Sequence, residues 1–284
     1  MCNGTIMDKL ISFSLPLMLS GILQLMFNAV DIIVVGRFSG SQALAAVGST
    51  SALINVFTNL FIGISLGANV LTARFYAAGR EKEVSETVHT AITLALVSGI
   101  VMALVGLVFS KGALALMGTP DDVIGLSALY MRIYFLGMPF FMLYNYGAAI
   151  LRAVGDTKRP LLFLMIAGVI NACLNMVLVI VFKLGVAGVA IATVISQMIS
   201  CVLVLRCLCR SESSYRLRFS ELGMKGYYLK QIFSVGVPAG IQSTVINFSN
   251  VLLQSSVNSF GSTAMAGYTA ANNLLGFLYV SVNS

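Results

Sequence analysis

The sequence predicts an all-α integral membrane protein, made of a six-helix N-terminal lobe and the first two helices of a repeated second lobe. Composition is the first of three observations behind this prediction. Of 284 residues, 58% are hydrophobic and 10% are charged, whereas soluble domains carry roughly a quarter charged residues. Mean hydropathy is +0.94. The second observation is a series of long apolar runs, and the third is a regular alternation of basic residues between the ends of those runs.

The apolar runs are long enough to cross a bilayer, which takes about 20 residues. Each run should be helical, because backbone groups in lipid must find their hydrogen bonds within the segment. Several runs exceed the minimum, so tilts or kinks are expected. The first run is too long for the apolar core of a signal peptide, and other runs follow it. The runs cover residues 10–36, 43–75, 86–110, 122–151, 160–182, 185–208, 227–258 and 263–284.

The basic residues sort to one side of these runs. Thirteen of the 17 Lys and Arg residues fall on the side of the N-terminus, while Arg37, Lys111 and Lys183 fall on the opposite side and Arg132 lies inside the fourth run. The positive-inside rule therefore predicts a multi-pass protein of the plasma (inner) membrane with a cytoplasmic N-terminus. This distribution accounts for the net charge of +7 without a nucleic-acid partner.

The polar segment 209–226 has the length of a linker and is expected in the cytoplasm. It divides the chain into an N-terminal transmembrane lobe, residues 1–208, and the start of a C-terminal lobe, residues 227–284. Since six helices return the chain to the side on which it began, the two lobes would be related by an axis along the membrane normal. We expect the second lobe to be truncated, because the sequence stops at Ser284 within its second helix.

A weak internal repeat supports this division. Pro16 near the start of the first run matches Pro238 in the seventh at an offset of 222 residues, and Asn28 then matches Asn250. The turns that follow these two runs also match, from Gly40 and from Gly261 onward, at an offset of 221.

Asp31 stands out among the ten acidic residues, because the other nine lie at predicted helix ends or in loops. A charge at membrane depth costs about 2.5–3.5 kcal/mol on insertion scales, so such a residue is a functional candidate. Burial disfavours the charged form of a carboxyl group, which suits reversible proton binding. The alternative is an interfacial residue that reaches outer-leaflet water near Arg37.

Polar side chains recur at helical spacing in four of the runs, and each set shares one helix face. Such a face is typical of a cavity lining, although hydrogen bonding between helices is an alternative, worth about 0.6 kcal/mol per contact. The polar face of the seventh run is made of neutral residues, which suit substrate hydrogen bonding or contact between lobes. The sets are Ser20, Gln24, Asn28 and Asp31; Asn171 and Asn175; Thr193 and Gln197; and Ser243, Asn247, Asn250, Gln254 and Asn258.

Several segments together resemble the MATE (multidrug and toxic compound extrusion) family. Residues 149–160 resemble a hallmark of that family, and Asn171, Asn175 and residues 185–196 follow in the family's order. The resemblance extends over essentially the whole chain. It implies two six-helix lobes around a central cavity, and a secondary active antiporter that exports drugs or organic cations in exchange for protons or sodium.

The resemblance to the prokaryotic proton-coupled type also implies a site. It makes Asp31 the proton-binding residue, with Gln24, Asn171, Asn175 and Thr193 around it. Tyr130 or Tyr134 could join this network from the fourth helix, and Asn28 lies on the same face as Asp31. Many relatives carry Asp at the position of Asn175, so Asp31 would act here as the sole carboxylate.

Coupling to sodium is the less favoured alternative. Sodium-coupled relatives place an acid on the seventh helix, where this chain has Ile246 and Asn247.

Other functions remain open as alternatives. A lipid-linked precursor flippase of the same superfamily would need a cationic cavity, for which Arg132 is the one candidate; a non-transporting membrane subunit is the alternative of another class. No nucleophile–base pair, phosphate-binding loop or metal-ligand set appears in the sequence, so neither an enzyme, a cofactor nor a metal site is predicted. His89, near the cytoplasmic start of the third helix, is expected to be solvated or to cap it.

Overall fold

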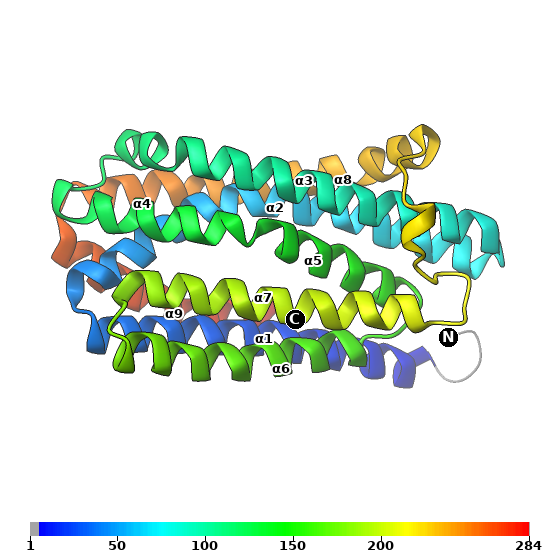
Figure 1. Ribbon diagram of the computed structural model, residues 1–284, viewed down its shortest axis with the longest axis horizontal. Coiled ribbons are helices and arrows are strands. Elements are labelled where there is room, and N and C mark those ends of the chain that lie inside the picture. Colours follow the sequence, from blue (N-terminus) through cyan, green and yellow to red (C-terminus); the bar gives the residue numbers. More distant parts are fainter. Residues whose placement is uncertain (1–5, 284) are drawn as a thin grey trace.

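The computed structural model describes the backbone of residues 6–283, which forms an elongated bundle of helices without a strand in that range (Figure 1). The connecting turns gather at the two ends of the bundle. The helices are α1 (Ile6–Phe38), α2 (Ser41–Ala77), α3 (Glu81–Leu116), α4 (Asp121–Leu136), α5 (Met138–Ala153), α6 (Lys158–Asn175), the π-helix η1 (Met176–Val181), α7 (Gly185–Arg210), the short 3-10 turn η2 (Phe219–Glu221), α8 (Gly226–Asn258) and α9 (Ser262–Asn283).

All eight predicted runs are helical, and two of them are interrupted. The fourth run is broken after Leu136 into α4 and α5, which are bent by 50°. Pro139 explains this break, because its ring removes one backbone N–H and disfavours a helical conformation of the residue before it. The fifth run changes to the π-helix η1 directly after Asn175. Single π turns are frequent at functional sites.

Five helices in the described part of the chain are long and apolar enough to cross a membrane, and the bent pair α4–α5 would make a sixth. These are α1, α2, α3, α6 with η1, and α7. Polar residues interrupt α8, which accounts for its lower hydropathy. The start of α1 and the α2–α3, α5–α6 and α7–α8 connections lie at one end of the bundle (the right-hand end in Figure 1), as the alternation of basic residues predicted.

Helix α8 packs against α2 at backbone distance. A Cβ added to Gly63 would lie 2.2 Å from the Cα of Gly240, and one added to Gly67 would lie 2.2 Å from the carbonyl oxygen of Ile232. The two helices run antiparallel. Near the end of α2 and the start of α8, the rings of Phe75 and Tyr228 meet edge to face with centroids 6.0 Å apart. Glycine at these positions is what allows the two backbones to touch.

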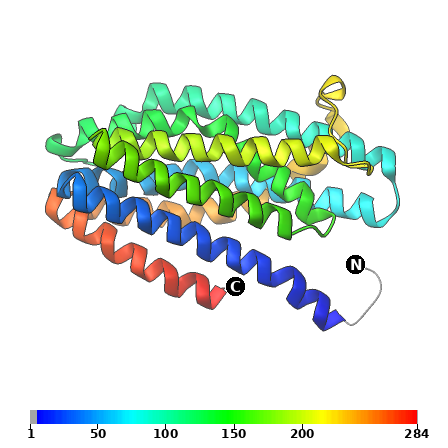
Figure 2. The ribbon, with the colours of Figure 1, turned by 60° about the horizontal axis from the view of Figure 1, so that its bottom comes forward.

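Helix α1 lies beside α6 and α9, and Figure 2 shows α1 and α9 side by side. The ring of Phe27 covers Gly168 of α6, where an added Cβ would lie 1.8 Å from a ring carbon. This close approach brings the next turn of α1, which carries Asp31, alongside the C-terminal turn of α6. The packing of an aromatic ring on a glycine therefore positions the carboxyl group.

Candidate functional site

Asp31 is half-buried and bonded to the end of α6. The amide nitrogen of Asn175 donates a hydrogen bond to Asp31 Oδ1 and another to Asn171 Oδ1 at 3.1 Å. Asn171 is 5% exposed and Asn175 is fully buried. Because the two asparagines are four residues apart, they lie on one face of α6. Asn175 bonds the carboxyl group and is itself bonded to Asn171.

A cavity of about 150 Å³ opens beside Asp31, between α1, α4, α5, α6 and α7. The rings of Tyr130 and Tyr134 form part of its wall, stacked with centroids 6.1 Å apart at 27°. The structure thus brings together the residues that the sequence singled out, with Asn175 joined to them through its bond to Asp31. The predicted residues that line this first cavity are Gln24, Asn28, Asp31, Tyr130, Tyr134, Asn171 and Thr193.

A second cavity, of about 250 Å³, is also lined by Asp31. It shares Asn28, Tyr130 and Tyr134 with the first cavity and adds residues of α2 and α9. Among the described side chains that line either cavity, Asp31 is the one that carries a charge. The carboxyl group therefore borders two polar spaces in an otherwise neutral surrounding.

Three polar residues that line the second cavity were not predicted from the sequence: Ser51 and Asn55 of α2, and Asn272 of α9. Ser51 and Asn55 are four residues apart in an apolar run, the same signal that marked Asn171 and Asn175, and it could have found them. Asn272 carries no such signal, because its place depends on the packing of α9 against α1.

Other polar residues of the predicted faces serve the helices themselves. The Ser20 hydroxyl donates to the Pro16 carbonyl at 2.8 Å. Gln254 and Asn258 are buried and bonded to each other at 3.0 Å, and Asn258 donates to the Met117 carbonyl at 3.0 Å. That end of α8 is therefore tied to the end of α3. The side chain of Asn247 lies outside the described residues.

The expectation that His89 is solvated or caps α3 is wrong. His89 is 4% exposed, because the segment between α7 and α8 folds over the start of α3 and covers it. Its ring nitrogens bond the Ser85 carbonyl and the backbone nitrogen of Arg218, and the N-cap of α3 is Arg80. No pattern in the sequence indicated this cover, since the segment is polar and of linker length.

Comparison with known proteins adds a family to this geometry. A family model described as MatE matches residues 16–177. Over 275 residues the chain is 37% identical to the probable multidrug resistance protein YoeA of Bacillus subtilis, covering 94% of this chain and 59% of YoeA. It is 29% identical over 273 residues to YpnP of the same organism, also named a probable multidrug resistance protein, covering 96% of this chain and 61% of YpnP.

A solved structure of similar fold is that of the MATE multidrug transporter DinF-BH in complex with the dye rhodamine 6G. It matches with a TM-score of 0.90 and 25% identity, over 97% of this chain and 62% of that one. The chain thus spans about three fifths of the length of the curated relatives that it matches.

Proposed function

The chain belongs to the MATE family of multidrug transporters, which are multi-pass membrane proteins and not enzymes, and from that premise we propose that it acts in a secondary antiporter. The antiporter would export drugs or organic cations in exchange for protons, and Asp31 would bind the proton. One observation carries this proposal. Among the described residues, Asp31 is the one charged side chain that lines two adjoining cavities, and the second of these cavities reaches α9.

A single carboxyl group in this position can couple two ions by competition. When Asp31 is charged, it attracts an organic cation into the second cavity; when it is protonated, that attraction is lost. A buried carboxylate without a cation is costly, so either a proton or the cation should neutralise it. Binding of one ion therefore favours release of the other, which is the requirement for exchange.

The neutral neighbours of Asp31 suit this role. Asn175 donates to the carboxylate and is itself placed by Asn171, so these bonds orient the Asp31 side chain. The stacked rings of Tyr130 and Tyr134 add an aromatic wall to both cavities. Aromatic faces attract organic cations, by about 0.5–2 kcal/mol depending on desolvation.

The division into lobes is part of the proposal: residues 1–208 form the first lobe, 209–226 the interlobe loop and 227–284 the start of the second. Two observations support it. Helix α8 packs on α2 and α9 packs on α1, the two contacts that a two-fold relation of α1 to α8 and α2 to α9 would generate. Gly40 and Gly261, which precede α2 and α9, both have φ 89°.

We further propose a location in the plasma (inner) membrane with a cytoplasmic N-terminus. The excess of Lys and Arg on the side of the N-terminus supports it. In this orientation the α7–α8 segment is cytoplasmic and Asp31 lies in the outer half of α1.

The proposal is tested by efflux of rhodamine 6G from cells that express the full chain, or from vesicles that contain it. Either a pH gradient or a sodium gradient supplies the driving force. We expect the pH gradient to drive efflux and Asp31→Asn to abolish it. Asp122→Asn is the matched control, since Asp122 is exposed at the start of α4, 3.5 Å from the Gln42 amide. Coupled efflux that is unchanged in Asp31→Asn would refute the mechanism, and efflux driven by sodium alone would refute the coupling ion.

A further inference from the structure

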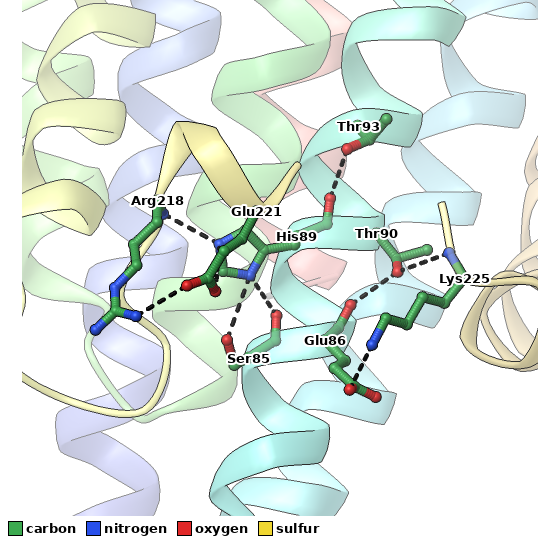
Figure 3. A network of polar contacts seen from close by, with 8 residues as sticks. All are labelled: Ser85, Glu86, His89, Thr90, Thr93, Arg218, Glu221 and Lys225. Atoms are coloured by element: carbon green, nitrogen blue, oxygen red, sulfur yellow. Dashed lines mark hydrogen bonds and ion pairs between the residues drawn. The ribbon is translucent and has the colours of Figure 1, made fainter. Parts of the chain in front are cut away.

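The segment between α7 and α8 is docked on the start of α3. Figure 3 shows the contacts, which join Glu86, His89 and Thr90 of α3 to Arg218, Glu221 and Lys225 of the segment. Leu217 is also buried, and its backbone N–H donates to the Leu208 carbonyl at 3.2 Å. This polar linker is therefore bonded to α3 and to the end of α7 through residues 217–225.

The hydrogen bonds of His89 define its charge state. Nδ1 lies 2.7 Å from the Ser85 carbonyl oxygen, which can only accept, so Nδ1 carries the proton. Nε2 lies 3.1 Å from the backbone nitrogen of Arg218, which can only donate, so Nε2 must be unprotonated. Both bonds are satisfied by one species, the neutral imidazole with its proton on Nδ1. A second proton on Nε2 would point at the Arg218 N–H.

The charged groups around His89 come from both partners of the contact. Lys82 and Glu86 face it from α3, and Arg218, Glu221 and Lys225 face it from the segment, around a cavity of about 430 Å³. Lys225 pairs with Glu86, and the Arg218 guanidinium donates to Glu221 at 2.8 Å. The other oxygen of Glu221 lies 3.8 Å from His89 Nε2.

Glu221 keeps its charge in mild acid. The guanidinium of Arg218 donates to its carboxylate and lowers the pKa of that group from its ordinary value. When the imidazole gains a proton, a carboxylate therefore stands ready as its new acceptor.

We propose that His89 is an acid-sensitive latch for the segment between α7 and α8. In the neutral state its Nε2 holds the backbone of Arg218. Protonation removes that acceptor, so the segment loses its backbone bond to α3. The attraction of the imidazolium for Glu221 does not replace this bond, because ion pairs that are exposed to solvent are weak and the Glu221 side chain is half exposed. The segment then loosens from α3, and α8, which begins at Gly226, gains freedom to move against the first lobe.

The latch stands on contacts far from Asp31, so it does not depend on the proposed transport mechanism. The direction of its response follows from the geometry. Docking is strongest at a pH where His89 is neutral and weakens as the pH falls. Histidine is the side chain whose charge ordinarily changes between about pH 5 and 8. In the proposed orientation the latch would respond to acidification of the cytoplasm.

Amide hydrogen exchange, measured by mass spectrometry on the full chain in lipid nanodiscs, tests the latch. Protection of peptides from residues 211–225 is compared at about pH 8 and about pH 5, after correction for intrinsic exchange rates. We expect protection in the wild type to fall about threefold to tenfold in acid, the effect of losing one or two hydrogen bonds. Peptides from residues 160–175, remote from the latch, supply the internal reference.

Two variants separate a titrating latch from a merely structural histidine. In His89→Gln the amide can still donate to Ser85 and accept from Arg218 but does not titrate, so protection should be equal at the two pH values. In Glu221→Gln the protonated imidazole has lost its carboxylate acceptor, so protection should fall further in acid than in the wild type. Glu212→Gln, an exposed acid of the same segment, should behave as the wild type.

Equal protection of the wild type at the two pH values would overturn the proposal. So would an acid-induced fall in His89→Gln as large as that in the wild type. Should His89→Gln fail to fold, the deeper fall expected for Glu221→Gln relative to Glu212→Gln decides the question, because an unchanged fall contradicts the latch.

Discussion

Helices α1 and α8 carry the same framework but different chemistry. Each spans 33 residues and contains an internal proline, Pro16 or Pro238, and each has an asparagine twelve residues later. Three residues after these asparagines the two helices differ, since Asp31 of α1 corresponds to Leu253 of α8, which is 55% exposed.

The two helices also differ in what they contact. Helix α8 touches the backbone of α2 through glycines, and its buried amides are bonded to each other and to α3. The polar face of α1 instead borders two cavities. A repeated helix pattern has therefore come to hold the structure together in one copy and to present an ionisable group in the other. Substitutions in α8 should act on stability, and substitutions in α1 should act on transport.

The largest effect on stability is expected where α2 meets α8. Gly63→Leu places a side chain where Gly240 leaves no room, so the helices must separate, at a cost of about 3 kcal/mol or more. Thermal unfolding of the purified protein should show a strongly lowered melting temperature. Gly112→Ala is the control, because an added Cβ there has no neighbour within 4 Å. An equal melting temperature for the two variants would show that the glycine contact does not hold the lobes together.

Asn258→Leu should lower stability by less. It breaks the bond to the Met117 carbonyl and leaves the buried Gln254 amide without its acceptor, a cost of about 1–3 kcal/mol. The contrasting variant on α1 is Asn28→Leu, which should leave the melting temperature nearly unchanged and reduce efflux of rhodamine 6G. A lowered melting temperature in Asn28→Leu with an unchanged one in Asn258→Leu would contradict the proposed difference, in which α8 stabilises the structure and α1 acts in transport.

The smallest effect is expected next to the carboxyl group. Asn175→Ala removes the donor that orients Asp31 but keeps the carboxylate, so efflux should fall about threefold to tenfold, as for loss of one hydrogen bond. The pH at which efflux is fastest should also move. Cys173→Ala, an exposed neighbour on α6, is the control for this region. A pH profile identical to that of the wild type would mean that Asn175 does not act on Asp31.

The helices and most residues of the candidate site were predictable, because a polar side chain inside an apolar run is costly and its spacing identifies its face. Asp31, Asn171 and Asn175 were found in this way. The break between α4 and α5 could also be predicted locally, because Pro139 lies at the start of α5. The π-helix after Asn175 had none, since it depends on packing.

Tertiary contacts account for what could not be predicted. Asn272 reaches the second cavity only because α9 packs on α1. His89 is buried because a linker folds over it, and the tautomer that makes it a latch depends on the backbone N–H of Arg218. The residue pattern of one segment does not indicate which residues of a distant segment will pack against it.

The competition between proton and cation at Asp31 can be measured directly by the protons released when rhodamine 6G binds. The purified full chain is titrated with the dye in weakly buffered solution, while a pH indicator reports released protons and the fluorescence of the dye reports binding. We predict that the dye displaces protons from the wild type, and that Asp31→Asn releases none over the range in which the dye still binds. Equal proton release by the wild type and Asp31→Asn would contradict the account.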